Sequence, residues 1–153
     1  MTHLKLQKLV FYAYGAAVAH DEDVPEIVFH SWKHGPVCVP VYEYFKPCGS
    51  AELSHVGSAG ALTGAAAAAV RVYEKLSAWQ LRQESHLEAP WIATRLGDAI
   101  SSESVRGHFC QKFSAPVYAP RNLVGSWSLA VDGLPALRAG SLHELAKALE
   151  AQA

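Results

Sequence analysis

The feature that most constrains the fold is the apolar periodicity of the first twenty residues. Apolar side chains recur three or four positions apart at Leu6, Leu9, Val10, Ala13 and Ala17. This spacing is the period of an α-helix with one buried face. Thr2 stands at the N-cap position, and the acidic residues 21–23 end the helical pattern. We expect Lys5 and Lys8 on the solvent side of this helix.

Glycine, proline and serine divide the next part of the chain into short elements. Residues 26–33 are β-branched and aromatic, which suits a strand or an extended segment. Pro36 is well placed at the first position of a following helix, where its missing N–H costs nothing. Residues 49–64 are rich in Gly, Ser and Ala and are typical of a loop. An alanine-rich helix then runs to about Leu76.

Later helix starts are marked by a capping box, a proline or a serine. These are Ser77 with Gln80, Pro90, and Ser101 or Ser102. Beyond them, Asp132-Gly133 predicts a hairpin turn, and Ser141 with Glu144 predicts the start of a last helix. We therefore expect an α+β, predominantly α-helical fold with a short β element. A compact helical body would span residues 1–115, and a β-turn-helix extension over 116–153 would pack on the same domain.

Composition excludes several classes of protein. The chain has 153 residues, of which 50% are hydrophobic and 18% charged, so it is not intrinsically disordered. Its net charge of -1 gives no general attraction to nucleic acid or anionic lipid. Three unpaired cysteines, the lack of a signal-peptide pattern and the lack of a membrane-spanning apolar run favour a soluble cytoplasmic protein.

No pattern of catalytic, metal-ligating or cofactor-binding residues stands out. Eight histidines are present, but His30 and His34 flank a predicted strand-to-turn, and no Cys-x-x-Cys or His-Glu-x-x-His phrase occurs. His86 with Glu84 or Glu88 could form an acid–base pair. The alternative, which we favour, is that the His86 side chain bonds to main chain in the turn before Pro90.

The aromatic residues suggest a different function. Tyr12 and Tyr14 lie on different faces of the first helix, so both can hardly enter the same core. Tyr14 or Tyr44 is therefore a candidate exposed anchor for a protein partner. The predicted partner-binding residues, which include a basic rim suited to an acidic partner, are Lys5, Lys8, Tyr14, Lys33 and Tyr44. Trp32, Tyr42 and Trp91 are expected to be structural.

Three phrases together resemble the Panacea-domain proteins, the group that includes the SocA-like antitoxins. The first runs from Leu4 to Leu9, with Tyr12 behind it; the second is Trp32-Lys33-His34-Gly35-Pro36-Val37; the third is Ser85-His86 followed by Pro90-Trp91. The matching region covers roughly residues 3–113. The family-motif residues, which we expect to be structural, are Leu6, Gln7, Trp32, Gly35, Pro36, Tyr42, His86, Pro90 and Trp91.

The resemblance implies a mostly helical antitoxin of a bacterial toxin–antitoxin pair. Such a protein binds a cognate protein toxin directly and needs no cofactor, and some members would act as adaptors that deliver the toxin to an AAA+ protease. Two alternatives come from other classes. One is a small hydrolase using His86 with a neighbouring carboxylate, and the other is a DNA-binding autoregulator with Lys5, Lys8 and Lys33 on one exposed face.

Overall fold

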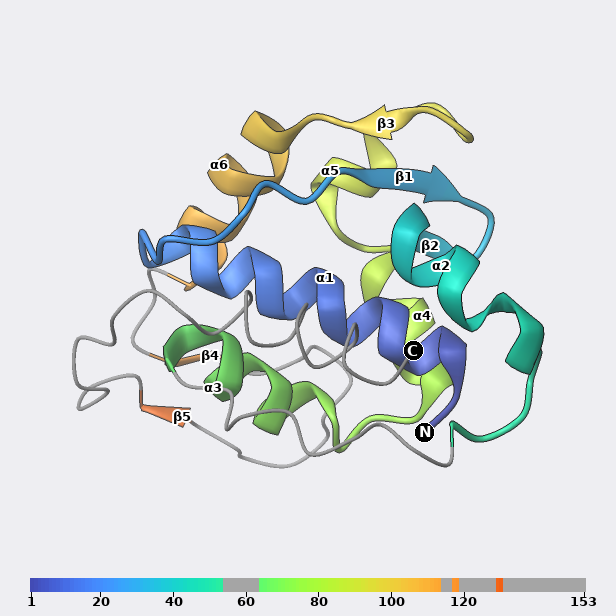
Figure 1. The fold of residues 1–153 in the computed structure, drawn as a ribbon. Helices are drawn as coiled ribbons and strands as arrows, with labels where there is room; N and C mark the ends of the chain where they lie inside the picture. The colour runs from blue at the N-terminus through green and yellow to red at the C-terminus, as the bar shows by residue number, and fades with distance from the viewer. Residues whose placement is uncertain (54–63, 114–116, 119–128, 131–153) are drawn as a thin grey trace.

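A computed structural model describes residues 1–53, 64–113, 117–118 and 129–130 (Figure 1). Its helices are α1 (His3–Ala19), α2 (Val39–Phe45), the short 3-10 helix η1 (Lys46–Cys48), α3 (Gly64–Tyr73), α4 (Ala78–Ser85), α5 (Ala89–Ile92) and α6 (Ser102–Phe113). Its strands are β1 (Phe29–Trp32), β2 (Gly35–Cys38), β3 (Ala99–Ile100), β4 (Val117–Tyr118) and β5 (Leu129–Ala130). The predicted α+β, predominantly helical class is confirmed.

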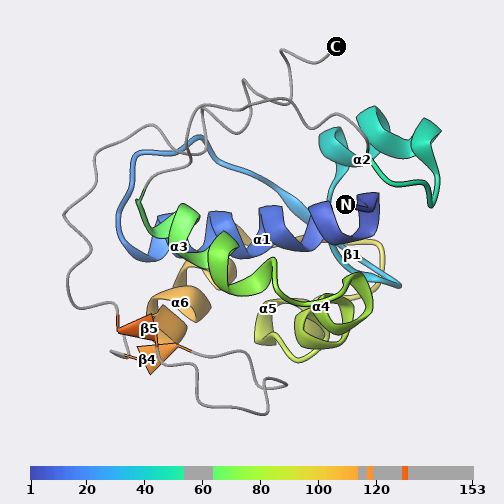
Figure 2. The same cartoon turned by 90° about the horizontal axis from the view of Figure 1, so that it is seen from below.

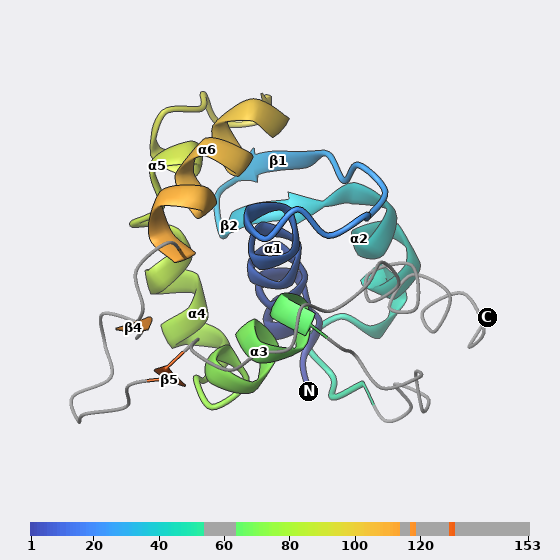
Figure 3. The same cartoon turned by 90° about the vertical axis from the view of Figure 1, so that its left-hand side faces the viewer.

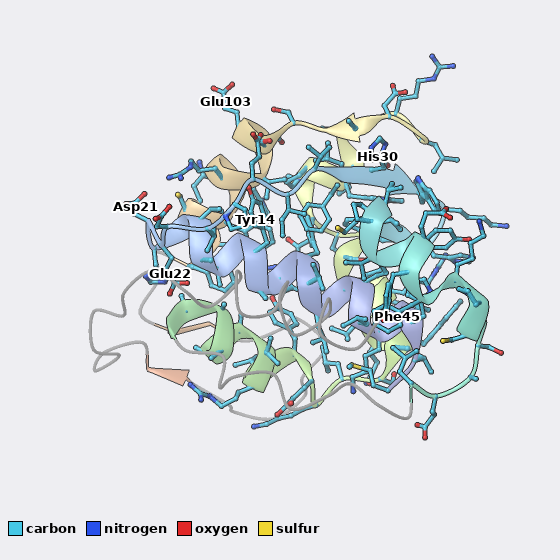
Figure 4. All side chains as sticks on the ribbon, viewed as in Figure 1. Tyr14, Asp21, Glu22, His30, Phe45 and Glu103 are labelled. Atoms are coloured by element: carbon cyan, nitrogen blue, oxygen red, sulfur yellow. The ribbon has the colours of Figure 1, made fainter. Side chains whose placement is uncertain are left out.

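Helix α1 runs through the centre of the described structure, and the other elements surround it (Figures 2 and 3). It packs against α3, α6, α4, β2 and α2. As a result every residue from Leu6 to Val18 is buried. A helix enclosed in this way has no solvent side, which explains why its apolar periodicity is incomplete.

This enclosure corrects two of the predictions for α1. Lys8 is fully buried, and Tyr14 is only 4% exposed, so neither lies on the surface. Tyr12 and Tyr14 occupy different faces of the helix, as expected, but both faces are covered. The ring of Tyr12 stacks on that of Tyr73 at a centroid distance of 3.7 Å, while Tyr14 packs against Phe29.

Aromatic rings fill the space between α1, β1 and α6. Phe11 lies in the middle, with its ring centroid 5.1 Å from that of Phe29 and 5.2 Å from that of Phe109, both in edge-on geometry. Gly15 permits this approach, because a Cβ at that position would overlap the ring of Phe109. Close packing of α1 on α6 therefore requires Gly15 opposite Phe109.

The sheet is antiparallel, in the order β2-β1-β3. Trp32 pairs with Gly35 across a tight turn, and Phe29 pairs with both Cys38 and Ile100. Pro36 therefore lies in β2. The prediction that Pro36 begins a helix is wrong. An edge strand tolerates proline, and Pro40 instead occupies the first turn of α2. This placement leaves the carbonyl of Pro36 free to face α1.

Helix starts follow the local signals of the sequence. Thr2 caps α1, and the capping box of Ser77 with Gln80 is complete, since each side chain bonds the other residue's main-chain N–H. The Oγ of Ser101 accepts the N–H of Ser104 at the start of α6, and Pro90 lies in the first turn of α5. These predictions are confirmed.

Part of the predicted extension lies outside the described residues. The Asp132-Gly133 turn and the capping box of Ser141 with Glu144 belong to this part, while β4 and β5 form a short antiparallel pair. The domain boundary near residue 115 stays a prediction. Within the described ranges, no helix has the length and apolar character needed to cross a membrane.

The contact between α1 and α6 gives a first testable prediction. Gly15→Ala should lower the free energy of unfolding by about 1–3 kcal/mol, because the added methyl group must displace the ring of Phe109. Thermal unfolding should show a fall in Tm of roughly 3–10 °C.

Gly107→Ala in α6 is the matched control. A Cβ there meets nothing within 4 Å, so the higher helix propensity of alanine should leave stability equal or raise it by up to about 1 kcal/mol. Equal effects of the two substitutions would contradict the proposed packing.

Candidate functional site

The three sequence phrases meet at the β1–β2 turn, and we call this meeting point the motif junction. It comprises Gln7, Lys8, Trp32, Gly35, Pro36, Cys38, Ser85, His86 and Trp91. The side chain of Gln7 of α1 bonds to both the main-chain N–H and the main-chain carbonyl of one residue of β2, Cys38. The N–H of Cys38 donates to Gln7 Oε1 at 2.9 Å, and Gln7 Nε2 donates to the carbonyl of Cys38 at 3.2 Å. The buried amide therefore fixes the position of β2 relative to α1.

Lys8 makes the second link between α1 and the hairpin. Its Nζ donates to the carbonyl of Pro36 at 2.7 Å. Gly35, next to that proline, has φ of +96°, and a Cβ there would lie 3.0 Å from Lys8 Nζ and would overlap Ser85 Oγ. Both the positive φ and the close approach require glycine at this position. Phrases from three distant parts of the sequence thus meet around one Cα atom.

Burial changes the chemistry of the Lys8 amine. Its removal from water and, to a lesser extent, the positive charge of Arg82 lower the pKa of Lys8 to about 7. The amine therefore loses its proton far more readily than an ordinary lysine does. Because the side chain has no exposed surface, this property affects stability rather than contact with a partner.

Helices α4 and α5 complete the motif junction through stacked rings. The rings of His86 and Trp91 are nearly parallel, with centroids 4.0 Å apart, and Trp91 Nε1 donates to the carbonyl of Trp32 at 3.1 Å. The prediction that the His86 side chain forms a hydrogen bond to main chain is wrong. Only its main-chain N–H takes part, as the C-cap of α4, and its Nε2 is buried with no hydrogen-bond partner among the described residues.

The electrostatics of His86 favour the neutral ring. Burial, followed by the charges of Arg82, Lys8 and His34, lowers the pKa of His86. Neutral imidazole stacks on indole without the cost of burying a charge. His86 therefore acts here as an aromatic surface that connects α4 to α5.

Glu88 lies in a separate buried cluster. Its carboxylate accepts hydrogen bonds from Tyr12 Oη at 2.9 Å, from His108 Nε2 at 2.6 Å and from Lys112 Nζ. Burial alone would raise its pKa, but the bonds from His108, Lys112 and Tyr12 and the charge of Lys112 hold the pKa of Glu88 below its usual value. Sequence reasoning missed His108 and Lys112, although their four-residue spacing on α6 was a usable signal.

The structure separates the residues predicted to bind a partner. Lys33 and Tyr44 are exposed, so their role in binding a partner stays a prediction. Lys5 is half-buried, and its Nζ donates to the carbonyl of Glu74 at 2.6 Å. Lys8 and Tyr14 are buried and are withdrawn from the set. The exposed face of three lysines that a DNA-binding autoregulator would need is therefore not present.

Sequence reasoning also missed four exposed apolar side chains between positions 79 and 96. They lie on α4, on the α4–α5 connection, on α5 and on the loop that follows: Trp79, Leu87, Ile92 and Leu96, exposed by 57%, 45%, 62% and 63%. Apolar residues in a helical pattern are normally read as core, so the sequence carries no signal that separates these four. We call this region the α4–α5 surface. Helices α4 and α5 lie on the opposite side of α1 from α2 in Figures 2 and 3.

No known family model, no curated protein and no solved structure matches this chain. The resemblance to the Panacea-domain proteins therefore rests on the quoted phrases alone. Among the described residues, no group of three His, Cys, Asp or Glu side chains is arranged to bind a metal ion.

The buried amine of Lys8 gives a pH-dependent prediction. Folding lowers the pKa of Lys8 from 10.5 to about 7, so between these values the unfolded chain binds a proton that the folded chain releases. The free energy of unfolding of the wild type, relative to that of Lys8→Met, should therefore rise with pH above about 7. The slope should approach about 1.4 kcal/mol per pH unit.

Urea unfolding of both proteins between about pH 6 and pH 9 measures this difference. Below about pH 7 the amine is protonated in both states, so the difference should be flat. A difference that is constant across the whole range would contradict the lowered pKa.

The Glu88 cluster gives a second pH-dependent prediction, in which stability again rises with pH but in the acidic range. Glu88→Gln should lower the free energy of unfolding at neutral pH by roughly 2–4 kcal/mol, because buried donors then face a neutral amide. Since folding lowers the pKa of Glu88, the contribution of the carboxylate is present above its ordinary value of 4.5 and is lost as pH falls through the lower folded value.

The stability difference between the two proteins should therefore shrink on acidification, as measured by urea unfolding at neutral pH and below about pH 4. The exposed Glu74→Gln is the matched control and should change stability by less than about 0.5 kcal/mol. An equally small effect of Glu88→Gln would show that the cluster is not a buried ion network.

Proposed function

We propose that this chain is a protein-binding module that acts as the antitoxin of a bacterial toxin–antitoxin pair in the cytoplasm. The observation that carries the proposal is the α4–α5 surface. Small soluble domains rarely leave several large apolar side chains exposed within one short stretch unless that stretch binds a partner. The exposed Trp79 is of the residue type most often found as an energetic anchor of protein interfaces.

The main chain beneath this surface is firmly held, which favours binding without a large loss of entropy. Glu88 anchors the start of α5 to α1 and α6, and Trp91 ties it to β1. The loop after α5 pairs with β1, since the N–H of Gly97 donates to the carbonyl of Ser31 at 2.6 Å and the N–H of Ser31 donates to that of Asp98 at 2.9 Å.

The antitoxin role is supported by the resemblance of the three phrases to the Panacea-domain proteins. The convergence of these phrases on the motif junction gives them a common structural purpose, which is to position α4 and α5 against the hairpin. The adaptor version of the proposal adds a second surface for an AAA+ protease. The exposed Tyr44 of α2, on the other side of α1, is a candidate for that second surface.

The hydrolase alternative receives less support from the geometry. Glu88, one of the two proposed carboxylate partners of His86, bonds Tyr12, His108 and Lys112. One ring nitrogen of His86, Nε2, is buried without a hydrogen-bond partner among the described residues. A general base needs hydrogen-bond reach to its substrate, which favours the binding module.

Co-expression with the product of the neighbouring open reading frame tests the proposal. If that product is toxic alone, the wild-type chain should restore growth and co-purify with it. Ile92→Asp should weaken both effects at least tenfold, because it places a charge in the middle of an apolar contact, whereas Tyr44→Asp should leave both unchanged.

Rescue accompanied by a fall in the level of the toxin, and lost in Tyr44→Asp, would favour the adaptor version. Both variants should retain the thermal stability of the wild type, since both positions are exposed. A harmless neighbour that does not co-purify would remove the antitoxin proposal. Equal loss of binding in the two variants would remove the assignment to the α4–α5 surface.

A further inference from the structure

We propose that the segment of the partner that docks on the α4–α5 surface is an acidic amphipathic helix, an inference that rests on the proposed binding function. The surface combines an apolar centre with a basic rim that has almost no exposed counter-charge. We define the centre as the exposed apolar side chains of this stretch, which are Trp79, Leu87, Ile92 and Leu96. We define the rim as Arg82 and Arg95 of the same stretch, with His34, which bonds to Arg82, and its neighbour Lys33.

Two contacts of Arg82 link Trp79 of the centre to His34 of the rim. Arg82 lies over the ring of Trp79, with its guanidinium carbon 4.6 Å from the ring centroid. The same side chain donates from Nε to Nδ1 of His34 at 3.1 Å, which places the β1–β2 turn beside α4. In Figure 2 the tip of this hairpin lies next to α4. His34 and Trp79, which are 45 positions apart in the sequence, therefore contact the same Arg82 side chain.

The acidic residues of the same stretch are removed from the surface by burial. Glu84 is 1% exposed and Glu88 is 3% exposed, and the carboxylate of Glu88 forms an ion pair with Lys112 and a hydrogen bond with His108. Asp98 is the one acidic side chain left exposed between positions 79 and 98. Exposed charge around the apolar centre is thus predominantly positive, although the whole chain carries a net charge of -1.

The geometry of Arg82 and His34 suits carboxylates. Because Nδ1 of His34 accepts from Arg82, the neutral imidazole carries its proton on Nε2, so that nitrogen is a donor. Among the described residues, the terminal nitrogens of Arg82 make no hydrogen bond, which leaves them to bind a carboxylate with two parallel bonds. The stacking of Arg82 on Trp79 restricts the guanidinium in advance and lowers the entropy cost of that contact.

A helix fits better than an extended strand. The apolar centre contains side chains from α4, from the α4–α5 connection and from the loop after α5, and the apolar stripe of an amphipathic helix can cover such a cluster. A partner strand would need a free edge of the described sheet, but the β3 edge is just two residues long and every residue of the β2 edge is buried. Acidic side chains flanking the apolar stripe of the partner helix would then reach Lys33, Arg82 and Arg95.

Two synthetic helical peptides test this inference directly with the full-length protein. Both carry Leu at positions i, i+3, i+4 and i+7, and the flanking positions are Glu in one and Lys in the other. Fluorescence anisotropy should show binding of the Glu peptide and at least tenfold weaker binding of the Lys peptide. Raising the salt concentration should weaken binding of the Glu peptide several-fold, because the rim charges are exposed.

Charge reversal on the protein identifies the rim. Arg82→Glu and Arg95→Glu should each weaken binding of the Glu peptide about tenfold, and the double variant should bind the Lys peptide better than the wild type does. Arg71→Glu, an exposed position of α3 outside the surface, is the matched control and should have no effect. Ile92→Asp should abolish binding of both peptides.

Several results would overturn the inference. Equal binding of the two peptides, or unchanged binding in both rim variants, would show that charge does not select the partner. Concentration-dependent dimerisation that Ile92→Asp abolishes would show that a second copy of this chain covers the surface. The growth-rescue assay separates these failures from failure of the proposed function: rescue lost in Ile92→Asp but retained in Arg82→Glu and Arg95→Glu would support the antitoxin proposal and overturn the acidic partner.

Discussion

Full enclosure of α1 is the constraint on which the rest of the structure depends. A central helix with no exposed side must satisfy every polar side chain that it carries, because an unpaired polar group in a dry core costs more than a hydrogen bond returns. Gln7 and Lys8 solve this problem with main-chain atoms of β2. The hairpin is therefore positioned by the polar residues of the core helix, and the apolar residues supply only the general attraction between them.

The positions of later elements follow from that arrangement. Lys8 requires the carbonyl of Pro36 to face α1, and this brings Gly35 against Ser85 at the end of α4. With α4 placed there, His86 stacks on Trp91, and Trp91 bonds to the last residue of β1. A chain of short-range contacts thus leads from the first helix to the surface formed by α4 and α5. Because the first and last steps are hydrogen bonds to main-chain carbonyls of the hairpin, that surface is supported by the core rather than carried on a free loop.

Capping residues in the sequence correctly predicted where several helices begin. The capping side chains of Thr2, Ser77 and Ser101 act within three residues, so the starts of their helices could be predicted. Lys8, Tyr14 and Pro36 were placed wrongly, because their environments come from elements far away in the sequence. Predicting burial from apolar periodicity assumes that one side of a helix is exposed to water. In α1, every residue from Leu6 to Val18 is buried, so this assumption fails. The sequence alone gave no sign that residues of the three phrases meet around Gly35, because that contact joins distant parts of the chain.

The charge of the molecular surface depends more on which charged residues are buried than on the overall composition. Nearly equal numbers of acidic and basic residues predicted a protein without a strong electrostatic preference. Folding then buries Glu84, Glu88 and Lys8, and of these the two carboxylates belong to the same stretch as Trp79 and Ile92. Arg82, which lies over the ring of Trp79, and Arg95, which precedes the exposed Leu96 in the sequence, keep exposed surface. A local excess of positive charge therefore arises from packing, and it lies where exposed apolar area gives a partner a reason to bind.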